Sequence, residues 1–147
     1  MKLSTKARYG VRAMLSLSLN YCKGHIPLKD VAKQQGVSEK YLEHLMVSLK
    51  TAGLVRSVRG THGGYVLARP PFQISLNEVV QTLEGSIAPV DCVDDPGLCR
   101  RVSSCVTRDI WEQMKEAMET VLESTTLQDL VERQRDREQP EGAMYHI

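Results

Sequence analysis

The chain has 147 residues, enough for one domain with an appendage. Its 41% hydrophobic and 25% charged residues are ordinary for a globular protein. The net charge of +1 conceals two opposite halves: residues 1–70 carry 12 Lys and Arg against 3 Asp and Glu, and residues 71–147 carry 7 against 15. No apolar run is long enough to span a membrane, and charges interrupt the N-terminus where a secretion signal would be apolar. We therefore expect a cytoplasmic protein whose basic half binds nucleic acid.

Hydrophobic periodicity in the first half predicts three helices, over residues 5–20, 28–35 and 39–52. The inner face of the first is expected to contain Val11, Met14, Leu15 and Leu19. Gly36 suits a tight turn between the second and third helices, and Ser38 is a good N-cap for the third. This layout is typical of a helix-turn-helix, in which the third helix lies in the major groove of DNA.

The period then changes to that of β-strands over residues 54–58 and 65–68, with a glycine-rich loop between them. A basic hairpin after a helix-turn-helix predicts a winged helix, whose wing follows the DNA backbone into the minor groove. Glycines in the wing would let the backbone approach phosphates. The candidate DNA-binding residues are Lys40, Tyr41, Glu43 and His44, expected to be exposed on the third helix, and Arg56, Arg59, Gly60 and Thr61 on the wing.

Two of these residues have a specific expected role. Glu43 would be repelled by phosphate, so its use would be to accept a hydrogen bond from cytosine N4, unless it is an ordinary surface charge. Arg59 could enter a narrow minor groove, where the negative potential is strongest, unless it is a flexible surface arginine.

The second half predicts an amphipathic helix over 75–84, a loop with three cysteines, a long helix over about 104–123 capped by Ser103 or Ser104, and a short helix from Leu127 whose charged continuation would be solvated. The long helix carries an apolar stripe too broad for one chain to bury, which predicts an antiparallel homodimer. The stripe contains Val106, Ile110, Trp111, Met114, Ala117, Met118, Val121 and Leu122.

The fold class predicted from these elements is mainly α with a small β-hairpin wing. We expect a DNA-binding domain over 1–85 (wing 54–68), a cysteine loop over 86–105, the dimerisation and C-terminal helices over 104–137, and a tail over 138–147.

Cys92, Cys99 and Cys105 are the candidate metal ligands. They lack the closely paired CxxC spacing of structural zinc sites, and three thiolates in an irregular loop suit an iron–sulfur cluster. Zinc, or thiols that sense redox or sulfur status without a metal, remains an alternative. Cys22 is expected to be a small buried side chain. No CxxC motif, Ser/His/Asp arrangement or phosphate-binding glycine loop favours an enzyme.

The stretches LSTKARYGVRAML and VSEKYLEHLMVSLKTAGLVRSVRGTHGGY, together with the cysteine trio, resemble the iron–sulfur cluster regulator family of the IscR type, to which the NsrR and CymR regulators are related. The resemblance covers about residues 1–130. It implies a homodimeric winged-helix regulator that binds a palindromic operator and represses cluster-assembly genes. It also implies a cluster, commonly [2Fe-2S] or in some relatives [4Fe-4S], and it places Glu43 and Arg59 at positions used for DNA discrimination.

The fourth cluster ligand departs from that family pattern. The IscR type has a histidine three residues after the last cysteine, where this chain has Arg108, and Arg8 replaces the N-terminal aspartate of the NsrR type. Imidazole suits iron better than carboxylate, so His146 is the preferred candidate, unless it is an ordinary tail residue. The alternative candidates are four nearby carboxylates, which would bind through oxygen: Asp91, Asp94, Asp95 and Asp109.

Overall fold

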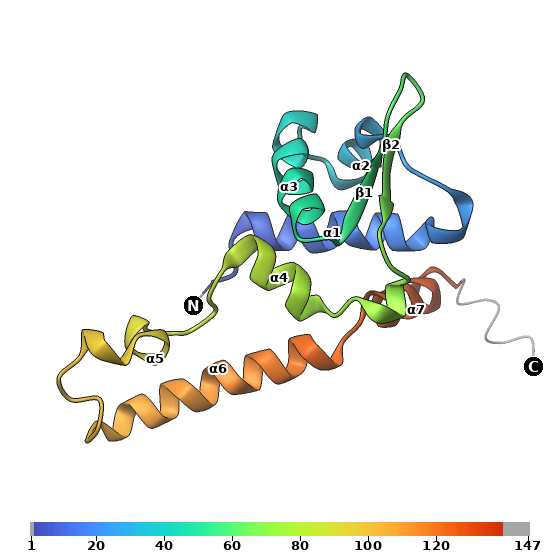
Figure 1. The fold of residues 1–147 in the computed structure, drawn as a ribbon. Coiled ribbons are helices and arrows are strands. Elements are labelled where there is room, and N and C mark those ends of the chain that lie inside the picture. Colours follow the sequence, from blue (N-terminus) through green and yellow to red (C-terminus); the bar gives the residue numbers. More distant parts are fainter. Residues whose placement is uncertain (1, 140–147) are drawn as a thin grey trace, which may run out of the picture.

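Helix α1 (Thr5–Leu19) crosses the middle of the molecule, with the helix-turn-helix and the hairpin on one side and the long helix α6 on the other (Figure 1). The computed structural model describes residues 2–139. The remaining elements are α2 (Leu28–Gln35), α3 (Glu39–Thr51), β1 (Val55–Val58), β2 (Gly64–Leu67), α4 (Leu76–Glu84), α5 (Asp91–Asp94), α6 (Val106–Ser124) and α7 (Leu127–Glu138), with single 3₁₀ turns at Tyr21–Lys23 (η1), Pro71–Gln73 (η2) and Pro96–Leu98 (η3). The predicted fold class, mainly helical with a two-stranded hairpin, is confirmed.

The turn between α2 and α3 forms as the sequence predicts. Gly36 adopts the left-handed conformation (φ 65°, ψ 34°), which glycine enters without steric cost. The side chain of Ser38 accepts a hydrogen bond from the backbone N–H of Tyr41 at 3.1 Å and so caps α3. Leu42, Leu45, Met46 and Leu49 of α3 are buried in the core.

The face of α1 that enters the core differs from the expected one. Met14 is buried as predicted, but Val11, Leu15 and Leu19 are only partly buried. The fully buried positions are Ala7, Gly10, Ala13, Met14, Ser16, Leu17 and Ser18. α1 packs closely on α4, and Leu83 lies directly against Gly10. The short side chains of α1 permit this close approach. The prediction from sequence followed the large hydrophobic residues instead, and most of these lie on the neighbouring face of the helix.

The two strands pair antiparallel, with Val55 opposite Leu67 and Val58 opposite Gly64. A Cβ on Gly64 would collide with the backbone carbonyl of Ile26, and one on Gly63 would collide with that of Val58. These glycines are therefore required by the folding of the hairpin on itself and on the segment before α2. The packing of the hairpin alone accounts for these two glycines, without the expected approach of their backbone to phosphate.

Helix α7 returns to the DNA-binding unit and completes its core. The N–H of Leu76 donates to the carbonyl of Thr125 at 2.8 Å, and the N–H of Leu127 donates to that of Ile74 at 3.0 Å. Leu127 and Val131 are buried, and α7 packs against α1 and η2. The structure thus differs from the expected division of the chain at residue 85, because α7 belongs with the N-terminal unit. It remains helical to Glu138, close to the end expected for the C-terminal helix at residue 137.

α6 has no fully buried residue along its described length, although it is the longest helix of the structure. One side faces α4 and α5. Val106, Ile110 and Val121 are exposed by 76%, 50% and 63%. Across residues 2–139, we find no helix with the length and apolarity that crossing a bilayer demands.

Replacing Leu127 tests whether α7 closes the core. Leu127→Ala should lower the free energy of unfolding by about 2–5 kcal/mol, because it leaves a cavity at a fully buried position. Urea unfolding at one fixed protein concentration measures the change. Arg133→Ala, at an exposed position of the same helix, should change it by less than about 0.5 kcal/mol. An unchanged midpoint for Leu127→Ala would mean that α7 is dispensable.

Candidate nucleic-acid interface and cysteine site

The exposed side of α3 presents three of the four residues predicted there. Lys40, Glu43 and His44 are exposed, and their spacing of three and four residues places them on one face. The opposite face holds the buried leucines, so this side of the helix is held outward by the core. α3 is therefore positioned to offer a cation, a carboxylate and an imidazole to a major groove.

The expectation that Tyr41 is exposed is wrong. It is half-buried against the core, and its hydroxyl oxygen is buried without a hydrogen-bond partner among the described residues. Its ring meets that of Tyr9 edge-on, with centroids 6.1 Å apart and an interplanar angle of 88°. Tyr41 precedes Leu45 by four residues, a spacing that already places it on the buried stripe. It fixes α3 against α1, and its hydroxyl faces away from solvent.

The wing carries Arg56 on β1 and Arg59, Gly60 and Thr61 at its tip, and all four are exposed. Gly60 has φ 111°, a conformation that favours glycine. Two contacts that the sequence does not predict hold the wing in place. The ammonium of Lys50 donates to Ser57 Oγ at 2.8 Å, which ties the end of α3 to β1. The ring of His25 lies within hydrogen-bond distance of the carbonyl of His62.

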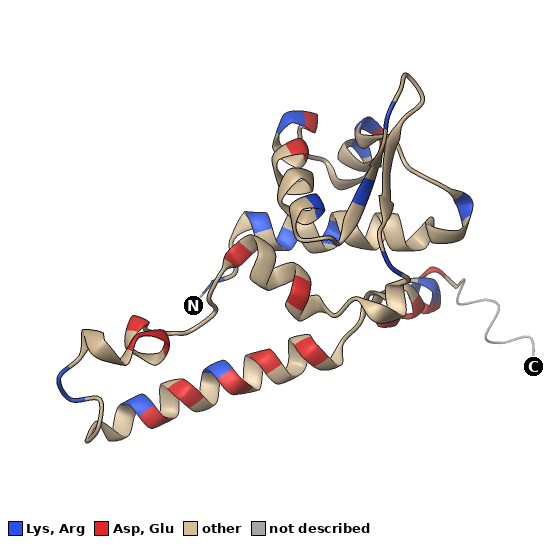
Figure 2. Ribbon diagram, viewed as in Figure 1, with Lys and Arg blue, Asp and Glu red and all other residues tan. Residues whose placement is uncertain are grey.

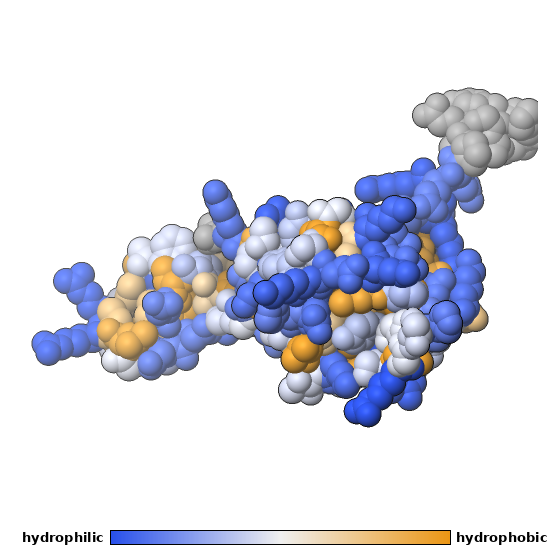
Figure 3. All heavy atoms as spheres, turned by 90° about the horizontal axis from the view of Figure 1, so that it is seen from above, coloured by the Kyte–Doolittle hydropathy of each residue, from blue (hydrophilic) through white to orange (hydrophobic). Residues whose placement is uncertain are grey.

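Charge separates between the two sides of the molecule. Lys and Arg predominate on the helix-turn-helix and hairpin, whereas Asp and Glu predominate along α4 and α6 (Figure 2). Viewed from the side on which α3 and the wing project, the surface is largely hydrophilic with scattered hydrophobic groups (Figure 3). A polyanion such as DNA would therefore be attracted to the face with α3 and the wing and repelled by α6.

The three predicted ligand cysteines lie on three different segments. Cys92 is in α5, Cys99 follows η3, and Cys105 is the N-cap of α6. Each is partly exposed with a free thiol. Within residues 2–139, no three His, Cys, Asp or Glu side chains are grouped so as to hold a metal ion. The soft thiolate donors suit iron or zinc and are accessible, but the loop has to close before they can share one group. His146 lies outside the described residues.

Arg108, which stands where the resemblance has a histidine, has a structural role. Its Nε donates to the backbone carbonyl of Cys92 at 3.2 Å, and its guanidinium pairs with Glu112 at 2.7 Å. A second tie lies nearby, because Lys115 pairs with Asp94 at 2.9 Å. These contacts hold α5 against α6.

Asp94 is less suited to serve as a ligand than its position in the sequence indicates. The hydroxyl of Ser86 and the ammonium of Lys115 hold the pKa of Asp94 below its usual value, and Asp94 in turn raises the pKa of Lys115. Its carboxylate oxygens are thus already hydrogen-bonded to two partners.

Cys105 occupies a distinctive position at the start of α6. The expected cap at Ser103 or Ser104 is wrong, since Cys105 is the N-cap residue. Its sulfur lies 3.1 Å from Thr107 Oγ1. This hydroxyl, followed by the backbone N–H of Arg108, lowers the pKa of the thiol. Cys22, expected to be buried, is instead exposed in η1.

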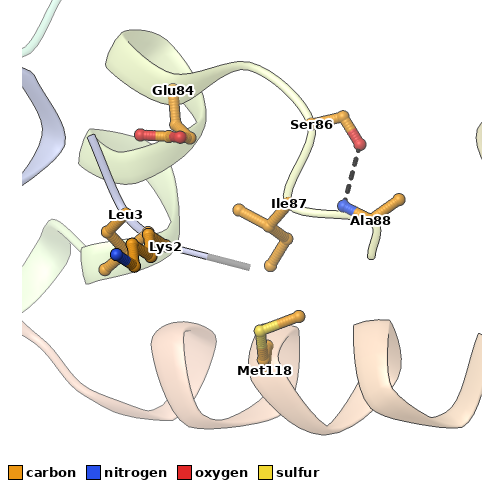
Figure 4. A pocket seen from close by; sticks show the side chains of 7 residues that line it. All are labelled: Lys2, Leu3, Glu84, Ser86, Ile87, Ala88 and Met118. Atoms are coloured by element: carbon orange, nitrogen blue, oxygen red, sulfur yellow. Dashed lines mark hydrogen bonds between the residues drawn. The ribbon is translucent and has the colours of Figure 1, made fainter. Parts of the chain in front are cut away.

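A small hollow of mixed polar and apolar lining marks the junction between the cysteine segment and the rest of the molecule (Figure 4). Met118 of α6 faces Ile87 of the α4–α5 linker across it, and the N-terminal Leu3 lies alongside. Ser4 donates through both its N–H and its hydroxyl to Glu84, at the end of α4, and this lowers the pKa of Glu84. The linker to the cysteines therefore begins at a point fixed to α1.

Comparisons with known proteins agree with the resemblance noted from the sequence. Residues 3–133 match the Rrf2 family model, described as an iron-dependent transcriptional regulator. The chain is 40% identical to the HTH-type transcriptional regulator CymR of Bacillus subtilis, over the full length of both. The T. potens IscR structure matches with a TM-score of 0.81 at 40% identity, covering 99% of this chain and 97% of the other. The B. subtilis CymR structure, titled the global cysteine regulator, matches at 0.77 and 39%, covering 90% and 98%. These relatives are named as regulators, not as enzymes.

The pKa of Cys105 leads to a reactivity prediction for reduced protein treated with a chelator. Iodoacetamide should alkylate Cys105 at a lower pH than it alkylates a cysteine in an unstructured peptide, because the thiolate is stabilised. Mass spectrometry of digests prepared across a pH series gives the profile. Thr107→Val, which removes the hydroxyl but keeps the shape, should move the profile to higher pH, whereas Thr107→Ser should retain it. A profile that Thr107→Val leaves in place would contradict this assignment.

Proposed function

Since this chain belongs to the Rrf2 family of transcriptional regulators, we propose that it is a DNA-binding regulator whose cysteines sense iron–sulfur cluster status. The observation that carries the proposal is the joining, in one fold, of a basic α3-and-wing face and three accessible thiols in the segment that leads into the long helix. The protein acts in the cytoplasm and represses genes for cluster assembly, in line with its likeness to IscR.

DNA is read by α3 in the major groove and by the wing alongside it. Glu43 accepts a hydrogen bond from a cytosine N4 and disfavours other bases. Arg59 enters the minor groove at the wing tip, where Gly60 and Thr61 approach the backbone. Phosphates are contacted by Lys40, His44 and Arg56, all of which are exposed. Tyr41 acts indirectly, by holding α3 in place.

α6 forms a homodimer by antiparallel docking against the same helix of a second copy. The support is the exposed apolar stripe on the side of α6 away from α4, with Val106, Ile110 and Val121 in solvent in the single chain. An apolar stripe of this length is covered by a partner in stable helical assemblies. Two-fold symmetry would present two copies of α3 to successive major grooves of a palindromic operator.

Cys92, Cys99 and Cys105 would hold the cluster, most simply [2Fe-2S], with [4Fe-4S] as the other possibility, and His146 is the proposed fourth ligand. When bound, the cluster supplies iron and sulfide. The protein keeps or loses the cluster according to the iron supply and to oxidation. The cysteines bind through thiolates, and Cys105 is the one whose pKa favours that form. Arg101 adds positive charge near this thiolate.

The cysteine segment can influence DNA binding because it is tied to α6. Bringing the three cysteines together has to move α5 and η3 relative to the start of α6, and so alters the Arg108–Cys92 and Lys115–Asp94 contacts. Because α6 is joined to the DNA-binding unit through α7 and beside α4, its orientation sets the separation of the two α3 helices. A coupling of about 1–3 kcal/mol is typical of such linked sites.

A second candidate is a regulator that uses zinc, or its thiols alone, to sense redox or sulfur status. Its metal-free form is favoured by the separation of the three cysteines in the described residues and by the lowered pKa of the Cys105 thiol. The likeness to CymR, titled a global cysteine regulator, also supports it. Colour distinguishes the two, because iron–sulfur proteins are reddish-brown and zinc proteins are colourless.

The central test compares operator affinity with and without iron. Protein purified without oxygen should contain iron and acid-labile sulfide. Chelation of the iron should change the Kd for the operator by about fivefold to 150-fold at equal salt. Cys92→Ala should lack sulfide and behave like the chelated protein, whereas Cys22→Ala should match the wild type. Gel shifts on one operator provide the measurement.

A variant of the wing separates DNA contact from switching. Arg59→Ala should weaken binding of DNA by the iron-loaded and chelated forms alike.

Mössbauer spectra of the wild type and of His146→Ala identify the cluster type and test the fourth ligand. Absence of iron and sulfide from all oxygen-protected preparations would overturn cluster sensing in favour of the second candidate. Equal affinities before and after chelation would overturn the switch.

A further inference from the structure

Val47 is an exposed hydrophobic residue on the helix that reads DNA. Within α3, all of which the structure describes, Leu42, Leu45, Met46 and Leu49 are buried, but Val47 is 57% exposed. The helix thus leaves one of its aliphatic side chains in solvent. Isolated hydrophobic residues are common on protein surfaces, so exposure alone does not indicate a role.

The position of Val47 is what distinguishes it. It follows Glu43 by four residues and His44 by three, so it continues the exposed face that begins at Lys40. Its next neighbour along the helix, one turn later, is Thr51, whose hydroxyl donates to the carbonyl of Val47 at 2.9 Å and is thereby occupied. The exposed side of α3 therefore presents polar groups in its first two turns and an isopropyl group in the third.

The surroundings of Val47 are suited to DNA and not to an apolar protein partner. The surface on this side of the molecule is largely hydrophilic (Figure 3), and the nearby end of α3 carries Lys50, bonded to Ser57 at the base of the wing. The apolar stripe of α6 lies on the far side of α1 (Figure 1). An exposed apolar group on a basic, groove-reading face matches a ligand that is anionic overall and offers an apolar point.

Among the base edges in the major groove, only thymine presents such a point, its 5-methyl group. Valine is suited to meet it, because branching at Cβ restricts a helical valine to one favoured rotamer and holds its methyl groups in a fixed direction. Four residues at 1.5 Å each, about 6 Å along the helix axis, separate Glu43 from Val47, which is a little under two base-pair steps.

We infer that Val47 is a specificity-determining residue that contacts the methyl group of a thymine within two base pairs of the base pair read by Glu43. The inference rests on the proposed function and deepens it, because it names a base that the regulator requires.

Replacing thymine with uracil tests the contact directly, since it removes only the methyl group and preserves base pairing. An operator is first selected from a random duplex library with the full chain purified without oxygen. Each thymine in one half-site is then replaced by uracil, and Kd is measured by fluorescence anisotropy at fixed salt. At one position near the cytosine–guanine pair, the wild type should bind about threefold to tenfold more weakly, as expected for one lost methyl contact.

The variant Val47→Ala should bind the thymine and uracil operators with affinities that differ by less than about twofold, since the contact is already lost. Ser48→Ala, at the adjacent exposed position, should keep the full discrimination, and equal melting temperatures confirm that both variants fold. A wild type indifferent to uracil at every position would overturn the inference, as would Val47→Ala retaining the penalty. Failure to enrich any sequence would instead refute operator binding itself, and the inference with it.

Discussion

Backbone pairing between the segment before α4 and the segment after α6 is the constraint on which the rest of the structure depends. Leu76 and Thr125, and Leu127 and Ile74, share two hydrogen bonds of 2.8 and 3.0 Å, and Leu127 is fully buried beside them. The pairing returns the chain to its N-terminal unit after a long excursion through the cysteines. α6 is therefore fixed to the DNA-binding unit at its C-terminal end, while Arg108 and Lys115, nearer its N-terminal end, bind the cysteine segment. A helix held in this way can transmit a change at one end as a change of angle.

The distribution of charge and hydrophobicity follows from that arrangement. The basic face of α3 and the wing is on one side of α1, and the acidic α6 with its uncovered apolar stripe is on the other (Figure 2). In the proposed dimer, DNA and the second copy of the chain would bind at the same time, because the two proposed surfaces lie on opposite sides. The cysteines are on neither surface. They occupy the bend where α5 is tied to α6 through Arg108 and Lys115, which is where a small change in the loop alters the position of the helix.

Much of this could be predicted from the sequence, because local physics determines it: Gly36 and Ser38 specify the turn, and the leucine spacing of α3 specifies its buried face. What could not be predicted depended on distant partners. Tyr41 is half-buried because Tyr9 of α1 meets it, and α7 joins the N-terminal core because Ile74 pairs with Leu127. Arg108 departs from the family pattern, and only the structure shows that it binds the backbone of Cys92. The cysteine spacing indicated a metal site, but spacing alone could not show that the three thiols stand on separate segments.

In the proposed dimer, closing the cysteine segment moves the two copies of α3 relative to each other. The most direct measurement is the distance between spin labels on the two copies, by pulsed electron resonance. The label is introduced as a noncanonical amino acid at Lys29, an exposed position of α2, so that all cysteines stay unmodified. The account predicts that the distance distribution of the iron-loaded dimer is shifted or narrowed relative to the chelated dimer. Superimposable distributions, with the cluster verified in one sample and absent from the other, would contradict it.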